Sequence, residues 1–275
     1  MPLVPKREKY ALFATATAVG LLIVFVGIMV LATNARLADY IFVISLMVAL
    51  LPVGVLDYLE FRWRRAVEAR MPDILYDIAE GQVTGMTFLR ALESAAMRDY
   101  GAASRELRRI LTQIKLGMTP EGAFMSFARR VGSRLVKNAS LIIVETSRSG
   151  GDVSKVVRTL SNYMRLVLTM DAERRGAMRL YIAVTYVAYG VLMVTLTILL
   201  NQFFLPVIEL SGTMIFTAQA GYETYRRLFF YLSVIQGVFS GLVAGKMGEG
   251  AVSAGLKHIV VMLFLALLVF TIFVA

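Results

Sequence analysis

Few residues in this chain are of a type that performs catalysis. The 275 residues include no cysteine and one histidine, His258, which leaves no thiolate nucleophile, disulfide or Cys-based metal site. The segment SGLVAGKM at 240–247 falls short of a phosphate-binding loop, which requires glycine at Ser240 and serine or threonine at Met247. The segment GEGAVS at 248–253 lacks the third glycine of a dinucleotide fingerprint. The sequence therefore predicts a protein that is not an enzyme and holds no cofactor or metal.

Basic side chains are the better candidates for a binding surface. Lys and Arg outnumber Asp and Glu by 29 to 19, and the formal net charge is +10. In a membrane protein such an excess marks the cytosolic side, which we favour over nucleic-acid binding. Seven basic residues exceed what that bias requires, and they are candidate contacts to a protein partner, with a solvated surface as the equal alternative: Arg105, Arg108, Arg109, Arg129, Arg130, Arg134 and Lys137.

A segment of three short helices, residues 116–165, is expected to position many of these groups. Thr119 is a candidate N-cap with Pro120 in the first helical position, and Gly132 can end that helix. Ser133 can cap the second helix, and Asp152 the third. Glu145 lies near the end of the second helix, where it either pairs with a neighbouring arginine or water, or fixes the following turn or contacts a partner.

The flanking sequence is too apolar for a soluble protein. The hydrophobic fraction is 58%, against roughly 45–50% in ordinary domains. We expect an all-α, polytopic protein of the cytoplasmic membrane with about five transmembrane helices, at residues 11–32, 40–56, 180–200, 228–245 and 258–275. The predicted divisions are 1–56 with two spans, a cytosolic domain of about six helices at 57–179, and 180–275 with three spans and an external loop at 201–228. The N-terminus would then be cytosolic and the C-terminus external.

Three features of this layout are specific predictions. In the domain, a helix beginning at Pro72 should carry an exposed acidic stripe of Asp73, Asp77 and Glu80. The last domain helix has no stop signal before the third span, so it should run on as a stalk, with Gly176 as the one position that could break it. In the fourth span, small residues recur every fourth position, a pattern that lets two helix backbones approach closely within the chain or at a subunit interface: Ser233, Gly237, Gly241 and Gly245.

The segment GMTPEGAF, followed about twenty residues later by VETSRSGGDVSKVV, resembles the F-domain family of type II secretion and type IV pilus systems. That family shows a G-x-x-x-x-x-A-F/L helix start and then E-x-x-x-x-G-x-[LIV]. Residues 71–96 and 245–262 are similar to the archaeal branch, which includes platform proteins of the archaellum and of adhesion pili. The positions that carry the family motif are Gly117, Pro120, Ala123, Phe124, Glu145, Gly150, Gly151 and Val153.

The resemblance implies a non-enzymatic membrane platform that anchors a filament-assembly or secretion machine. Its expected partners are a hexameric secretion ATPase, pilin-like subunits, and a second copy or a second platform protein in a dimer. An archaellum, an adhesion pilus and a secretion pseudopilus are all compatible with it. The alternative is a small-molecule transporter or channel with a regulatory cytosolic domain, although the spans lack the mid-membrane polar residues typical of transporters. A third interpretation, a nucleic-acid-binding membrane protein, rests on charge alone.

Overall fold

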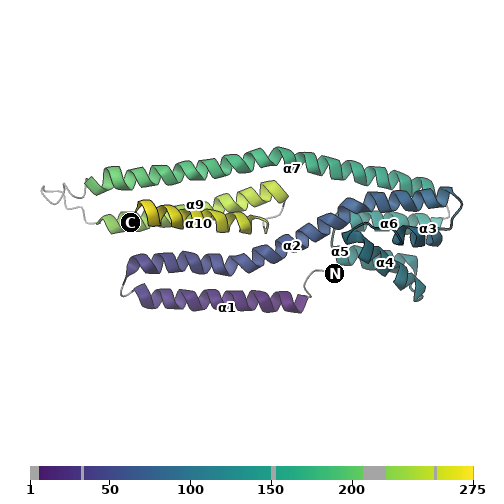
Figure 1. The fold of residues 1–275 in the computed structure, drawn as a ribbon, viewed down its shortest axis with the longest axis horizontal. Coiled ribbons are helices and arrows are strands. Elements are labelled where there is room, and N and C mark those ends of the chain that lie inside the picture. The colour runs from purple at the N-terminus through teal and green to yellow at the C-terminus, as the bar shows by residue number, and fades with distance from the viewer. Residues whose placement is uncertain (1–5, 32–33, 150–152, 207–220, 251–252, 275) are drawn as a thin grey trace. The chain divides into compact units, whose positions relative to one another are not determined.

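A computed structural model of the protein describes residues 6–31, 34–149, 153–206, 221–250 and 253–274 (Figure 1). These described residues form helices and no β-strand, which confirms the predicted all-α class. The elements are α1 (Lys6–Leu31), α2 (Ala35–Val83), α3 (Phe88–Ala96), α4 (Ala102–Lys115), α5 (Pro120–Val131), α6 (Arg134–Ser149), α7 (Val153–Ile198), the π-helical η1 (Leu199–Phe204), α9 (Tyr222–Glu249) and α10 (Gly255–Phe273).

The described chain divides into two compact units. One, which we call the bundle, comprises residues 59–174. The other, which we call the apolar unit, comprises residues 6–58 and 175–274. Two long helices, α2 and α7, each begin in one unit and end in the other without interruption.

The bundle contains six helical segments: the second part of α2, the whole of α3, α4, α5 and α6, and the first part of α7. Each short helix presents one apolar face inward, and the buried side chains form a single cluster. Burial of this surface provides the main stabilisation, because an apolar side chain contributes about 1.5–3 kcal/mol when it is fully removed from water. The largest fully buried members of the cluster are Leu75, Ile78, Leu92, Ile110, Ile143 and Met164.

The local start and stop signals in the bundle act as the sequence predicts. The side chain of Thr119 accepts a hydrogen bond from the backbone N–H of Gly122 at 3.2 Å, and Pro120 is the first residue of α5. Gly132 ends α5 with a φ of +65°, a conformation that favours glycine. The Ser133 hydroxyl then accepts a hydrogen bond from Val136 N–H at 3.3 Å at the start of α6. The predicted cap Asp152 lies outside the described residues.

The predicted helix start at Pro72 is wrong, because α2 continues through this residue to Val83. A proline inside a helix removes one backbone hydrogen bond but keeps a helical φ. Here the neighbouring Met71, Ile74 and Leu75 are all buried in the bundle core, so packing on both sides of the proline keeps the helix intact.

The predicted acidic stripe is partly exposed, and each of its carboxylates has a basic partner. Asp73 Oδ1 lies 3.2 Å from Arg165 Nη2, and Asp77 Oδ1 lies 2.6 Å from Arg98 Nη1. Glu80 forms an ion pair with Arg158. The three carboxylates therefore hold α2 to α7 and to the turn after α3, a tertiary relationship that helical spacing alone does not reveal.

Four helices of the described chain are long and apolar enough to cross a membrane, and they lie in the ranges 36–83, 153–204, 222–249 and 255–273. This composition fits a multi-pass membrane protein. Helix α1 contributes a shorter apolar stretch, residues 17–30. The fifth span that the sequence predicts in this region stays a prediction.

Helix α7 runs without a break through Gly176, as expected for the proposed stalk, and Figure 1 draws it as one continuous ribbon. Within the apolar unit, its Tyr189 is almost completely buried. The Tyr189 hydroxyl lies 3.1 Å from the carbonyl oxygens of both Ser233 on α9 and Met262 on α10. One side chain thereby links three helices of this unit.

Candidate partner-binding site

Six of the seven basic side chains that the sequence singles out lie exposed on the bundle. Arg105, Arg108 and Arg109 share one face of α4, at the i, i+3 and i+4 positions. Arg129 is in the last turn of α5, and Arg134 and Lys137 lie in the first turns of α6. We call these six residues the basic face. Within the described part of the chain, none of them has an ion-pair partner within 4.0 Å.

The charges elsewhere in the bundle are mostly compensated, which sets the basic face apart. Arg65 pairs with Asp171, and Lys115 Nζ lies 2.9 Å from Glu93 Oε1. The hydrogen bond from Lys115 holds the pKa of the Glu93 carboxyl below its usual value. Most carboxylates of the bundle therefore pair with basic side chains of the bundle itself. The six cations of the basic face remain available to an anionic partner.

Arg130 differs from the other six candidates. Its Nε donates to Glu106 Oε2 at 2.8 Å, and its Nη1 donates to the Ser126 hydroxyl at 2.7 Å. The side chain of Glu106 is only 2% exposed and that of Arg130 only 15%. Arg130 therefore compensates a buried carboxylate between α4 and α5, and its predicted role as a partner contact stays a prediction.

The family-motif positions mainly shape the bundle. Gly117 has a φ of +91°, and its N–H donates to Ile114 O as the chain leaves α4. Ala123 and Phe124 are buried in the core, next to the helix start at Pro120. Glu145 is exposed near the end of α6. Val153 begins α7 and packs against the bundle core. The motif positions Gly150 and Gly151 lie outside the described residues.

The small residues of the fourth predicted span lie on the buried face of α9 that packs against α10. A Cβ added to Gly241 would lie 2.6 Å from the backbone nitrogen of Ile259, and one added to Gly245 would lie 2.1 Å from that of Gly255. At Gly237 the nearest atom would be the Tyr189 hydroxyl, at 3.0 Å. Ser233 is fully buried. The stripe therefore brings two helices of the same chain into contact.

Sequence reasoning missed a polar cluster in the apolar unit, where α2 and α9 begin. Arg227 Nε and Nη2 donate to the two oxygens of Asp39 at 2.8 and 2.9 Å, and the Tyr231 hydroxyl donates to Asp39 at 2.7 Å. Arg226 is 2% exposed and pairs with Glu223 at 3.3 Å. Carboxylates thus compensate the positive charge of both arginines. The separation of Asp39 and Arg227 by 188 residues explains why no local pattern reveals the pair.

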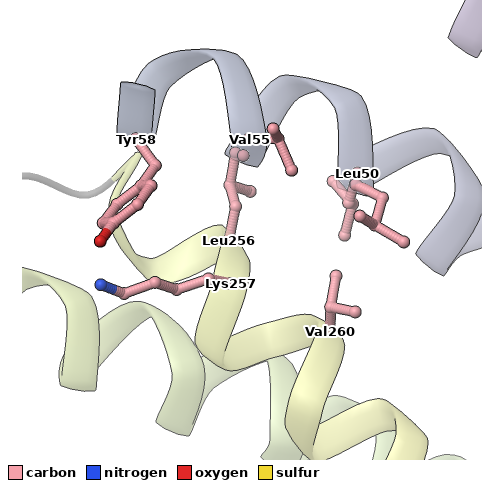
Figure 2. A pocket seen from close by; sticks show the side chains of 8 residues that line it. Leu50, Val55, Tyr58, Leu256, Lys257 and Val260 are labelled. Atoms are coloured by element: carbon pink, nitrogen blue, oxygen red, sulfur yellow. The ribbon is translucent and has the colours of Figure 1, made fainter. Parts of the chain in front are cut away.

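An apolar cavity of about 360 Å³ lies in the same unit, between α2 and α10. Figure 2 shows Leu50 and Val55 on one side and Leu256 and Val260 on the other. At its edge the Lys257 Nζ lies 5.0 Å from the centre of the Tyr58 ring, and Lys257 also pairs with Glu249. The cavity offers apolar contact but no convergent set of polar groups for a small-molecule substrate.

Metal binding finds no support among the described residues, which contain no group of three or more His, Asp or Glu side chains placed to hold an ion. His258 instead makes a 2.8 Å hydrogen bond through Nδ1 to the Tyr186 hydroxyl. The geometry therefore defines a helical membrane protein with a charged helical bundle, in which the basic face is the candidate site.

Comparison with known proteins finds a family match for part of this chain. Residues 75–200 match the family model of the type II secretion system (T2SS), protein F. The matched region begins in α2, covers α3 to α6 and extends through α7. The chain thus carries a domain of the type II secretion system F family, as the motifs predict.

One curated relative is an uncharacterized protein of Methanocaldococcus jannaschii. It is 24% identical over 227 residues, which are 82% of this chain and 37% of the relative. The chain thus spans well under half the length of the curated relative it matches. Among solved structures, none matches this chain.

Proposed function

We propose that the protein is a platform of a secretion or filament-assembly machine in the cytoplasmic membrane, and that its bundle binds a cytosolic hexameric ATPase. The family match supports the class of machine, and the multi-pass apolar composition supports the membrane location. The observation that carries the proposed ATPase contact is the basic face. It presents six exposed cations in a bundle whose other charges are mostly paired.

The bundle would lie on the cytosolic side of the membrane. Helices α2 and α7 would continue from it into the membrane spans. In this arrangement the N-terminus is cytosolic, α1 is a fifth span and the C-terminus is external. The continuous α7 supports the proposal that movements of the ATPase pass from the bundle to the spans. Pilin-like subunits would then be lifted from the membrane, and the work would come from the ATPase because this chain is proposed to have no nucleotide site.

The test is retention of the ATPase by the full-length chain in native membranes, through a tag at the N-terminus, with mass spectrometry of the retained proteins. The triple variant Arg105→Glu, Arg108→Glu, Arg109→Glu should weaken retention by about tenfold or more at low salt, because like charges then face the partner. Raised salt should weaken retention by the natural chain in the same way.

A matched control is available in the bundle. Arg62 is exposed and, within the described chain, has no ion-pair partner, so Arg62→Glu changes the charge outside the basic face. Arg62→Glu should reduce ATPase retention much less than the single variant Arg109→Glu does. Equal retention by all variants would exclude the basic face as the contact, and the absence of any secretion-type ATPase would remove the main support for the platform role.

A further inference from the structure

We propose that two copies of this chain pair along α7, which presents an exposed apolar seam with the spacing of a parallel coiled coil. The proposal does not depend on the ATPase contact. It assigns a surface and a register to a dimer, neither of which the family resemblance specifies. Its evidence is the exposure of α7 in each unit.

In the apolar unit, one face of α7 packs inward and the opposite face has no partner in the described chain. Tyr189, Met193 and Leu196 are buried, at 5% exposure or less. The residues on the other face recur with alternating steps of four and three, and each is 53–69% exposed: Leu180, Val184, Val187, Val191, Val194 and Ile198. This 3.5-residue repeat is the spacing of a coiled-coil seam.

In the bundle, the same repeat continues backwards along α7. Tyr163, Leu166 and Met170 are 54–59% exposed and keep the four-and-three steps, whereas Val157 and Met164 on the inner face are fully buried. Because this part of α7 also carries Arg158, Arg165 and several further charges, it is too polar to lie among lipid tails. A lipid coating therefore cannot account for the whole seam, and a helix of another chain can.

Small residues flank the seam in the apolar unit. The residue directly before every second seam residue is small. These residues are Gly176, Ala183, Gly190 and Thr197. A Cβ added to Gly176 or Gly190 would meet no atom within 4 Å, so packing inside this chain does not require either glycine. Since an interior helical glycine costs about 1 kcal/mol relative to alanine, close approach of a second backbone gives these glycines a role.

The space beside these glycines is open. A cavity of about 390 Å³ lies between α7 and α10 and is lined by Gly190, Val194 and Ile198 on one side and by Leu265, Val269 and Phe273 on the other. Its lining is apolar, and it adjoins the seam. A neighbouring helix that contacts the seam would also fill this cavity.

The shared topology of two copies favours a second copy of the chain over an unrelated helix. Two copies in one membrane have the same topology, so their α7 helices run parallel and each seam residue faces its own counterpart about a two-fold axis. Parallel two-stranded coils prefer β-branched residues at one seam position and leucine at the other. The seam carries β-branched residues at the first position from Val184 to Ile198, after Tyr163, Met170 and Ala177. At the second position it carries Leu166, Leu180, Val187 and Val194. Thr159 and Glu173 are its polar exceptions.

The available area is sufficient for a dimer. From Val156 to Ile198 the helix is about 63 Å long at 1.5 Å per residue. A contact strip roughly 10 Å wide would then remove on the order of 1,200 Å² from solvent and lipid over both copies. That value reaches the lower end of the range for stable, specific interfaces, about 1,200–2,000 Å².

The test uses the absence of cysteine from the natural sequence. Single variants Leu166→Cys, Val184→Cys, Val187→Cys and Val191→Cys would be oxidised in native membranes with copper phenanthroline and separated by mass. We expect each to form a disulfide dimer at twice the 30.4 kDa chain mass. The matched control is Ile235→Cys on α9, which is 57% exposed against 60% for Val191 but lies off the seam.

Two results would overturn the proposal. The first is dimer formation by Ile235→Cys at the same rate as by Val191→Cys, which would indicate random collision. The second is cross-linking of seam cysteines only to a protein of another mass, or to none. If the seam pairs as proposed, Gly190→Ala should also lower the yield of the Val191→Cys dimer severalfold, because a Cβ there would obstruct the partner helix.

Discussion

Arg227 on α9 and Asp39 on α2 form a two-point ion pair, with Nε–Oδ2 and Nη2–Oδ1 distances of 2.8 and 2.9 Å. The Asp39 residue is 3% exposed. Two parallel hydrogen bonds between charged groups give the strongest geometry available to such a pair. The pair therefore fixes the beginning of α9 against the beginning of α2.

Removal of one partner of this pair should lower the free energy of unfolding. In Arg227→Gln the Asp39 carboxylate loses its cation while it remains buried, and we expect a loss of about 3 kcal/mol in the free energy of unfolding. The measurement is reversible unfolding of the purified chain in detergent micelles. Arg36→Gln is the control, because Arg36 and Glu223 form a pair with side chains 43% and 49% exposed, for which less than about 1 kcal/mol is expected. Equal losses in the two variants would argue against a special role for Asp39.

Arg129 and Arg130 are neighbours with opposite expected effects. Arg130→Ala removes one charge-assisted hydrogen bond of the buried Glu106 and should lower the free energy of unfolding by about 1.5–3 kcal/mol. Arg129→Ala removes an exposed side chain and should change it by less than about 0.5 kcal/mol. Thermal unfolding and ATPase retention, measured on the same preparations, separate the two roles. A stable Arg130→Ala protein that no longer retains the ATPase would restore Arg130 to the binding surface.

Gly241→Ala should disrupt the contact between α9 and α10. The new Cβ would lie 2.6 Å from the backbone nitrogen of Ile259, which cannot move without displacing α10. We expect a loss of about 1–3 kcal/mol, as for other overpacked cores. Ser240→Ala changes the adjacent residue, which is partly exposed, and should cost less than about 0.5 kcal/mol. Comparable unfolding midpoints for both variants would show that α9 and α10 are separated in the protein.

Asp99 gives the bundle a specific dependence on acid. Its carboxylate accepts hydrogen bonds from Gly101 N–H at 2.8 Å and from the Ser104 hydroxyl at 3.1 Å at the start of α4. These bonds hold the pKa of the Asp99 carboxyl below its usual value. A carboxyl with a lowered folded pKa stabilises the fold above its ordinary pKa of about 3.9, and this stabilisation is lost as the pH falls through the lowered value.

The corresponding variant is Asp99→Asn, which keeps an acceptor oxygen but carries no charge. We expect it to unfold at a lower temperature than the natural chain near neutral pH, with a difference that shrinks as the pH falls below about 4. The measurement is thermal unfolding of the full chain in detergent at successive pH values. A difference that stays constant down to acidic pH would indicate that the ionised form of Asp99 is not the one stabilised.

The sequence by itself determined the helical class, the apolar composition of the spans and the F-family motifs. It also determined local boundaries such as the Thr119 cap and the Gly132 stop, because these depend on backbone groups only a few residues away. The same local reasoning failed at Pro72, where burial of residues on both sides keeps α2 continuous despite the missing hydrogen bond.

Only the tertiary structure decided which charged and apolar groups are free. It engages Asp73, Asp77 and Glu80 in ion pairs and separates Arg130 from the basic face. It also distinguishes the two apolar faces of α7. Periodicity identifies apolar positions, but burial depends on contacts between segments far apart in the chain, so the structure alone shows that the face carrying Val184 and Val191 is exposed.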